Sequence, residues 1–171
     1  GVVLLLAMVI GAAAAVIGSP MGILFADESG DPNSIPIAEI VADTNADFGA
    51  AINDIVSAHP ECSETTITYD YEDGHTWASY WPEVLAIFAV HTNLNSDSDV
   101  VVINAAQMQR IQDTFWAMHN ITYEVEEVDV TPEPTEDDPD PEQQTEYILH
   151  ITVSSKTVDE LAELYNFTQD Q

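Results

Sequence analysis

Residues 121–153 read ITYEVEEVDVTPEPTEDDPDPEQQTEYILHITV, in which two β-branched and aromatic runs flank an acidic, proline-rich segment. Runs of this composition predict strands, and two strands joined by a polar connection predict an antiparallel hairpin. The connection, residues 131–144, is too rich in proline and charge to pack against a core. We therefore expect a long hairpin with an exposed, mobile tip.

The two predicted strands differ in their side-chain patterns. Apolar residues alternate without interruption through the second strand, at Tyr147, Leu149, Ile151 and Val153. In the first strand the alternation slips between Val125 and Val128. The slip predicts a β-bulge near Glu126 and Glu127, because an extra residue on one strand shifts the faces of those that follow.

The remaining elements are predicted from their periodicity. Apolar side chains three and four positions apart predict an amphipathic helix over residues 37–57. A β-branched and aromatic run predicts a strand at 65–71. Further helices are expected at 79–91 and after Asn104, which is a favourable N-cap residue.

A last helix is expected after Thr157, which has capping-box spacing with Glu160. The predicted order is helix, strand, helix, helix, strand, strand, helix, which gives an α+β fold. We expect one domain over residues 36–171, with about four helices and an antiparallel sheet that includes the hairpin.

The amino-terminal segment, residues 1–26, reads GVVLLLAMVIGAAAAVIGSPMGILFA and contains no charged side chain. About 20 apolar residues cross a hydrocarbon core of about 30 Å, so we expect a transmembrane anchor. A cleaved signal peptide is the alternative, although its apolar core is usually only about 7 to 15 residues long. Because the segment has no initial Met and no basic flank, an upstream cytoplasmic piece is also expected.

Residues 27–35 are acidic and rich in turn-forming residues, and we expect them to form a linker outside the membrane. The chain is then expected to be a single-pass protein of the cell membrane. Its domain, residues 36–171, would be extracytoplasmic.

Charge is distributed very unevenly, with 31 Asp and Glu against only Arg110 and Lys156, and the net charge is −29. Neutralising phosphates requires clustered Lys and Arg, so nucleic acid is excluded as a partner, and so is an anionic lipid surface. Such an acidic surface suits concentrated salt, a cationic ligand or a basic partner.

Residues 81–93 read WPEVLAIFAVHTN and place one carboxylate, Glu83, at the head of an almost wholly apolar segment. A glycosidase needs a second carboxylate about 5 to 9.5 Å from the first, and the sequence identifies none. Proline and an acid both favour the first turn of a helix, where the acid meets the positive end of the helix dipole. A helix start is the structural interpretation of Glu83, and a glycan-cleaving acid is the alternative.

Cys62 with His59 or His75 supplies a thiol and a base, but no recognisable sequence context surrounds the cysteine, and we expect a free thiol. The five histidines lack the short paired spacing of zinc sites; they are His59, His75, His91, His119 and His150. Residues 93–99 space oxygens like a calcium loop, yet the central glycine is missing and Asn104 stands in place of the bidentate glutamate. We expect no metal, no cofactor and no catalytic residue in this chain.

Four segments occur in the order of a known family: SPMGILFADESGD at 19–31, WPEVLAIFAVHT at 81–92, DTFWAMHNITYEVE at 113–126 and YILHITVSSKTVDELAELYNFTQDQ at 147–171. They resemble the amino-terminal, membrane-anchored region of large cell-wall hydrolases carried by conjugative and other mobile elements of Gram-positive bacteria. In that family a catalytic CHAP-type or related cysteine amidase/endopeptidase domain lies further toward the carboxyl end. Cys62 does not match its motif, and the surplus of acid departs from the family.

The resemblance implies a non-catalytic tether and spacer that helps to place a peptidoglycan-cutting domain in the wall during transfer of the element. The expected partners are the membrane, through residues 1–26, and peptidoglycan or a conjugation-machinery protein. A pilin-like surface subunit is one alternative, although Leu5 stands where such subunits usually carry an acid. A glycan-cleaving domain that uses Glu83 is the other.

Overall fold

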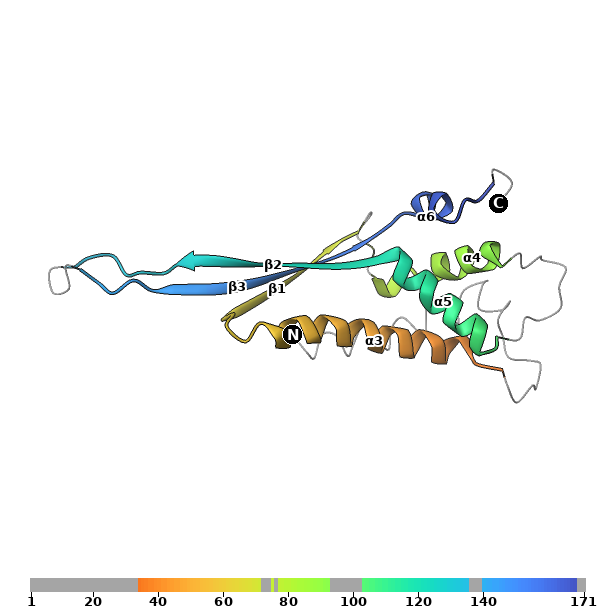
Figure 1. Ribbon diagram of the computed structural model, residues 1–171, viewed down its shortest axis with the longest axis horizontal. Coiled ribbons are helices and arrows are strands. Elements are labelled where there is room, and N and C mark those ends of the chain that lie inside the picture. Colours follow the sequence, from red (N-terminus) through yellow and green to blue (C-terminus); the bar gives the residue numbers. More distant parts are fainter. Residues whose placement is uncertain (1–33, 72–74, 76, 93–102, 136–139, 169–171) are drawn as a thin grey trace.

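The computed structural model describes residues 34–71, 75, 77–92, 103–135 and 140–168. The predicted order of helices and strands is confirmed, with one added 3-10 helix, and so is the α+β class (Figure 1). The elements are α3 (Ile37–Ala58), β1 (Glu64–Asp70), η2 (Trp77–Ser79), α4 (Trp81–His91), α5 (Ala105–Met118), β2 (His119–Asp129), β3 (Thr145–Ser155) and α6 (Val158–Leu164).

The expected anchor, residues 1–26, lies outside the described residues, as does most of the expected linker, residues 27–35. Among the helices of the described part, none is both long enough and apolar enough to cross a membrane.

Helix α3 begins after Pro36, which has an extended backbone and provides no side-chain cap. Its buried residues recur three and four positions apart and are Ile37, Ile40, Val41, Thr44, Asn45, Phe48, Gly49 and Ile52. Thr44 satisfies its buried hydroxyl within the helix by donating to the carbonyl of Ile40 at 2.7 Å. The fully buried stripe ends at Ile52, and in the last turns of α3 Ile55 and Val56 are partly buried against the core.

The three strands of the described part form one sheet in the order β1–β3–β2. Strands β2 and β3 are antiparallel, which confirms the predicted hairpin. Strand β1 pairs with β3 in the parallel direction, so the sheet is mixed and the expectation of an antiparallel sheet is wrong for this pair. The chain between β1 and β3 passes through α4, α5 and β2, and a connection of this length is what parallel pairing requires. Residue composition indicates a strand but not which neighbour it pairs with.

The expected β-bulge is also wrong, because the register of β2 and β3 runs unbroken through Glu126↔Ile148 and Glu127↔Tyr147. The burial pattern explains the slip in alternation, since most of β2 is exposed on both faces. Where neither face of a strand is buried, no core selects apolar residues at alternate positions.

The hairpin is longer than the rest of the sheet. Strand β1 reaches only to Ile148 of β3, whereas β2 pairs with β3 as far as Thr145. Beyond the strands, the Val130 amide donates to the carbonyl of Gln144, and the Gln144 amide donates to the hydroxyl of Thr131, each at 2.9 Å. The ribbon therefore stands out from the rest of the molecule (Figure 1). We call residues 123–150 the arm; within it, residues 136–139 lie outside the described part.

At the other end of the sheet, helices enclose the core. The Trp81 indole N–H of α4 donates to the Asn45 side-chain oxygen of α3 at 3.0 Å. The ring of Trp81 stacks on Phe115 of α5 with centroids 5.0 Å apart, and Phe48 meets Phe115 edge-on at 5.5 Å. All four side chains are fully buried, so one contact set joins three helices. We call α3, α4 and α5, together with residues 119–122 of β2 and 151–155 of β3, the helical end.

Both predicted helix caps are confirmed. The Asn104 side chain accepts hydrogen bonds from the amides of Ala106 and Gln107, and the Gln107 side chain accepts one from the Asn104 amide. Thr157 and Glu160 form the same reciprocal arrangement at the start of α6. Each box satisfies amide groups that the first turn of a helix leaves without partners.

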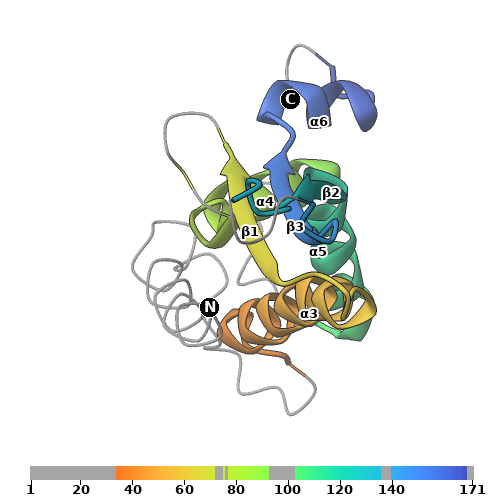
Figure 2. The same cartoon turned by 90° about the vertical axis from the view of Figure 1, so that its left-hand side faces the viewer.

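The two faces of the sheet have different surroundings. Helix α3 runs along one face, and Leu149, Ile151 and Val153 of β3 are buried on the core side (Figures 1 and 2). The opposite face carries polar side chains, including Thr68 and His150. No described helix lies over that face at the base of the arm (Figure 1).

Candidate functional site

Glu83 lies in the first turn of α4, directly after Pro82, as predicted. Its side chain is half-buried, and its Oε2 atom is buried without a hydrogen-bond partner among the described residues. The two ion pairs of the described part involve other residues. The geometry therefore matches an acid at the favourable end of a helix dipole.

Cys62 lies between α3 and β1, and its amide donates to the carbonyl of His59 at 3.2 Å. Burial, and then the nearby carboxylate of Glu61, raise the pKa of the Cys62 thiol, which disfavours the thiolate. The His59 ring is occupied by Glu61, with Nδ1 and Oε1 3.0 Å apart. The His75 ring packs against Tyr80. Within the described residues, neither histidine forms a hydrogen bond with the thiol.

In the part of the chain that the structure describes, no group of three or more His, Cys, Asp or Glu is placed to hold a metal ion. The calcium-like spacing at residues 93–99 lies outside that part. Asn104, which would take the last position of such a loop, caps α5.

His119, the first residue of β2, is buried in an aromatic cluster. Its ring stacks on Phe115 with centroids 4.2 Å apart and meets Phe48 and Tyr80 edge-on. Nδ1 donates to the Phe115 carbonyl at 2.8 Å, and since a carbonyl only accepts, the proton lies on Nδ1. Nε2 is then a buried acceptor without a partner among the described residues. Burial lowers the pKa of His119 to about 4, so the ring is neutral and belongs to the core.

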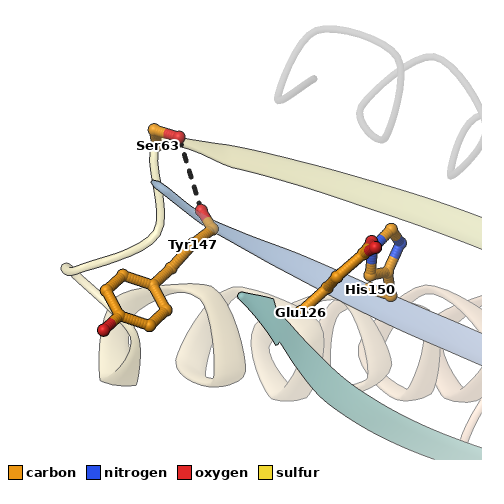
Figure 3. A network of polar contacts seen from close by, with 4 residues as sticks. All are labelled: Ser63, Glu126, Tyr147 and His150. Atoms are coloured by element: carbon orange, nitrogen blue, oxygen red, sulfur yellow. Dashed lines mark hydrogen bonds and ion pairs between the residues drawn. The ribbon is translucent and has the colours of Figure 1, made fainter. Parts of the chain in front are cut away.

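The polar face of the sheet brings side chains from all three strands together. Thr68, Glu124, Glu126, His150 and Thr152 lie on this face and line a shallow cavity of about 540 Å³, whose lining also includes Val125 between the two acids. Nε2 of His150 lies 2.8 Å from Oε2 of Glu126, and the two side chains meet on this face (Figure 3). The register places His150 directly opposite Glu124. Because the side chains of His150 and Glu126 are 33% and 57% exposed, solvent screens this pair and it adds little stability.

No Lys or Arg occurs between residues 123 and 150. The two cationic side chains of the protein lie elsewhere, Arg110 on α5 and Lys156 after β3, where its ammonium donates to the Ala117 carbonyl at 2.8 Å. The arm therefore has no permanently positive side chain beside its carboxylates, and His150 is its one imidazole. The surface of the arm favours cationic groups.

The core-side face of the hairpin stays open along the arm. Tyr123, Val125 and Tyr147 are 53%, 39% and 37% exposed, although the register places Tyr123 and Val125 opposite the buried Ile151 and Leu149. The ring of His59, just after α3, contacts Tyr123 with centroids 5.0 Å apart. Apolar side chains are thus exposed where α3 ends.

Ser63 ties the base of the arm to the connection between α3 and β1. Its amide donates to the carbonyl of Tyr147 at 2.9 Å, and its hydroxyl lies 3.4 Å from that carbonyl and from Oε2 of Glu146. In Figure 3 the Tyr147 ring points to the opposite side of the ribbon from His150. The contact fixes where the arm leaves the domain.

Comparisons with protein-family models, curated proteins and solved structures found no match to this chain. The functional assignment therefore rests on the geometry of the described residues and on the residue pattern of the chain.

Sequence reasoning missed both surfaces of the arm. From the sequence, Tyr123 and Val125 are alternating positions of an ordinary strand. His150 is one of five histidines without the spacing of a zinc site, and no role was predicted for it. The polar face could have been predicted from the hairpin register. Glu124 and Glu126 are two positions apart on β2, and His150 and Thr152 are two positions apart on β3, so all four point to one face. The sequence offered no equivalent signal for Thr68, since the parallel partner of β1 was not predictable.

Proposed function

We propose that this chain is a non-catalytic positioning module of a cell-wall hydrolase carried by a Gram-positive mobile element. In this role residues 1–26 anchor the chain in the cell membrane as a transmembrane helix, and the α+β domain lies outside the cytoplasm. Peptidoglycan or a protein of the conjugation machinery is the partner. The four segments that resemble this family support the assignment.

The observation that carries the proposal is the arm. Strand β2 has 11 residues and, at about 3.3 Å per residue, is about 36 Å long. Ordering a residue costs about 1 to 2 kcal/mol, which folded proteins offset mainly by burying apolar surface. Between Leu149 and the tip of the arm, none of the described residues has a fully buried side chain. We infer that contact with another molecule offsets the cost of ordering the arm.

The candidate catalytic groups support a non-catalytic role. Within the described residues Glu83 forms no ion pair and its Oε2 atom has no hydrogen-bond partner, and the Cys62 thiol has a raised pKa and no hydrogen bond to an imidazole. General acid–base and thiol chemistry both depend on such pairs being within hydrogen-bond reach.

A lytic assay tests the non-catalytic role. The full 171-residue chain and its Glu83→Gln variant are incubated with purified peptidoglycan, and soluble fragments are measured. We expect neither protein to release fragments above the buffer control, because Glu83 forms no ion pair among the described residues and its Oε2 atom has no hydrogen-bond partner there. Release that the substitution lowers by about 10² or more, with the fold intact by circular dichroism, would instead identify Glu83 as an acid–base catalyst.

A fusion in a Gram-positive host tests the tether. A reporter joined after Gln171 should sediment with membranes and be digested by protease added outside the cell, and deletion of residues 1–26 should leave the reporter in the soluble fraction. A reporter that is protected from outside protease would contradict the proposed orientation. Recovery of the fusion in sheared surface filaments would favour a pilin-like subunit instead.

A further inference from the structure

Strand β2 is an edge of the sheet. It pairs with β3 on one side, and no described strand pairs with it on the other. The outer side of an edge strand presents backbone N–H and C=O groups that can pair with an added strand. With 11 residues, β2 offers a longer edge than β1, which has seven.

A second copy of this chain does not suit the edge. Glu124, Glu126 and Glu127 lie close together on β2, and antiparallel pairing of two copies would set some of these carboxylates near one another. Like charges opposite each other in a sheet are destabilising. The net charge of −29 opposes self-association further.

The two faces beside this edge differ in chemistry. On the polar face, Glu124 and Glu126 line the cavity with His150, and Glu124 forms no ion pair among the described residues. On the core-side face, Tyr123 and Val125 expose apolar surface. Because successive side chains of a strand point to opposite faces, a strand added here would place alternate residues beside carboxylates and beside apolar groups.

We infer that the outer edge of β2 binds an extended peptide segment, with alternating basic and apolar residues, as a fourth strand of the sheet. The basic side chains lie over Glu124 and Glu126, and the apolar side chains cover Tyr123 and Val125. The inference rests on the proposed positioning role and names the chemistry of the partner that the arm holds.

The edge of β1 is the competing surface. Its carboxylates, Glu64 and Asp70, lie at its two ends, and its apolar residues Ile67 and Tyr69 are half-buried against the core. It therefore offers neither a row of acids nor an uncovered apolar face.

The probe is a capped, fluorescent nine-residue peptide of alternating Lys and Val, titrated into the full 171-residue chain in a neutral detergent at about 0.15 M salt. One control peptide has the same composition in a scrambled order. A second keeps the sequence but carries N-methyl groups on alternate amides along one edge, so that its charge is retained while its ladder hydrogen bonds are lost. We expect both controls to bind at least about tenfold more weakly, because the scrambled order no longer places Lys and Val on opposite faces and the N-methyl groups remove several ladder hydrogen bonds.

Two protein variants separate the edge from general acidity. Glu124→Gln with Glu126→Gln removes two charges at the edge, and Glu133→Gln with Glu142→Gln removes two exposed charges near the tip. We expect the first pair to weaken binding about threefold to tenfold, as two exposed ion pairs would, and the second to change it less than about twofold. Equal weakening by the two pairs would overturn the inference, because it would show non-specific attraction.

Hydrogen exchange locates the added strand. Peptide binding should slow exchange of alternate amides in residues 119–129, which face away from β3, and leave β1 unchanged. Protection of β1 instead, equal affinity for the N-methylated peptide, or no measurable binding would each refute the inference. The lytic and tethering assays do not involve this edge, so they test the positioning role separately.

Discussion

Strands β2 and β3 are buried at the helical end and exposed along the arm. At the helical end, His119, Ile151 and Val153 are almost fully buried, whereas along the arm Tyr123 and Tyr147 are 53% and 37% exposed. The backbone pairing is continuous through both parts. The difference comes from the helices, because α3 and α5 cover the sheet at one end and no described helix covers the arm.

The comparison separates stability from contact. Hydrophobic stabilisation scales with the apolar area removed from water, so the helical end holds the fold. The arm keeps its polar and apolar side chains available to another molecule. Substitutions at the helical end should therefore change the free energy of unfolding strongly, and substitutions on the arm should change it little.

The largest expected effect is the loss of an aromatic ring from the helical end. Phe115→Ala should lower the free energy of unfolding by about 3 to 5 kcal/mol, because the ring is fully buried between Trp81, Phe48 and His119. Tyr123→Ala on the arm should lower it by less than about 1 kcal/mol. Denaturant titrations in molar salt measure both. Similar losses would break the distinction between the two ends.

The next effect concerns pH and is confined to the helical end. Because burial lowers the folded-state pKa of His119 from 6.5 to about 4, the unfolded chain takes up the proton first. The contribution of His119 is fully present above about pH 6.5 and is lost as the pH falls toward 4, to a total of about 3 kcal/mol. His119→Phe fills the same aromatic site without titrating.

The stability difference between the wild type and His119→Phe isolates this effect, since the many carboxylates titrate in both proteins. We expect the wild type to lose about 3 kcal/mol relative to the variant between pH 7 and pH 4. A constant difference over this range would show that the ring is not held neutral by burial.

The third effect is that added salt should raise the thermal stability of the fold. The net charge of −29 is screened more as salt rises, with a Debye length of about 10 Å at 0.1 M and about 3 Å at 1 M, so the thermal midpoint should increase with sodium chloride. Amides of the arm, which contains no Lys or Arg, should gain more protection from exchange than those of α5. A midpoint that is flat or falls toward molar salt would contradict this account of the charge.

The elements could be predicted from the sequence because their cues are local. Helix α3 follows its three- and four-residue apolar spacing, and Asn104 and Thr157 cap the helices that they were expected to cap. The parallel pairing of β1 with β3 could not be predicted, because it depends on how the intervening helices fold back. The unbroken register at Glu126 was missed for a related reason, since apolar alternation reports burial and this part of β2 has none.

The candidate site was less predictable than the fold. Glu83 and Cys62 attracted attention as residue types, but reactivity depends on partners that only tertiary structure supplies. His119 and His150 have no distinguishing local sequence, yet one is enclosed by aromatic rings and the other lies beside Glu126 on an open face. The free edge of β2 follows from the strand order, which periodicity does not encode.

The central claim, that the helical end holds the fold while the arm is free to make contacts, is tested most directly by replacing Glu133–Glu142 with a short Gly-Ser linker. The segment reads EPTEDDPDPE and so has little apolar surface to bury, and loop-closure entropy changes by only about 0.6 kcal/mol for each doubling of length. The free energy of unfolding in molar salt should therefore change by less than about 1 kcal/mol. A loss comparable to that of Phe115→Ala would contradict the account, because it would show that the tip of the arm packs against the domain.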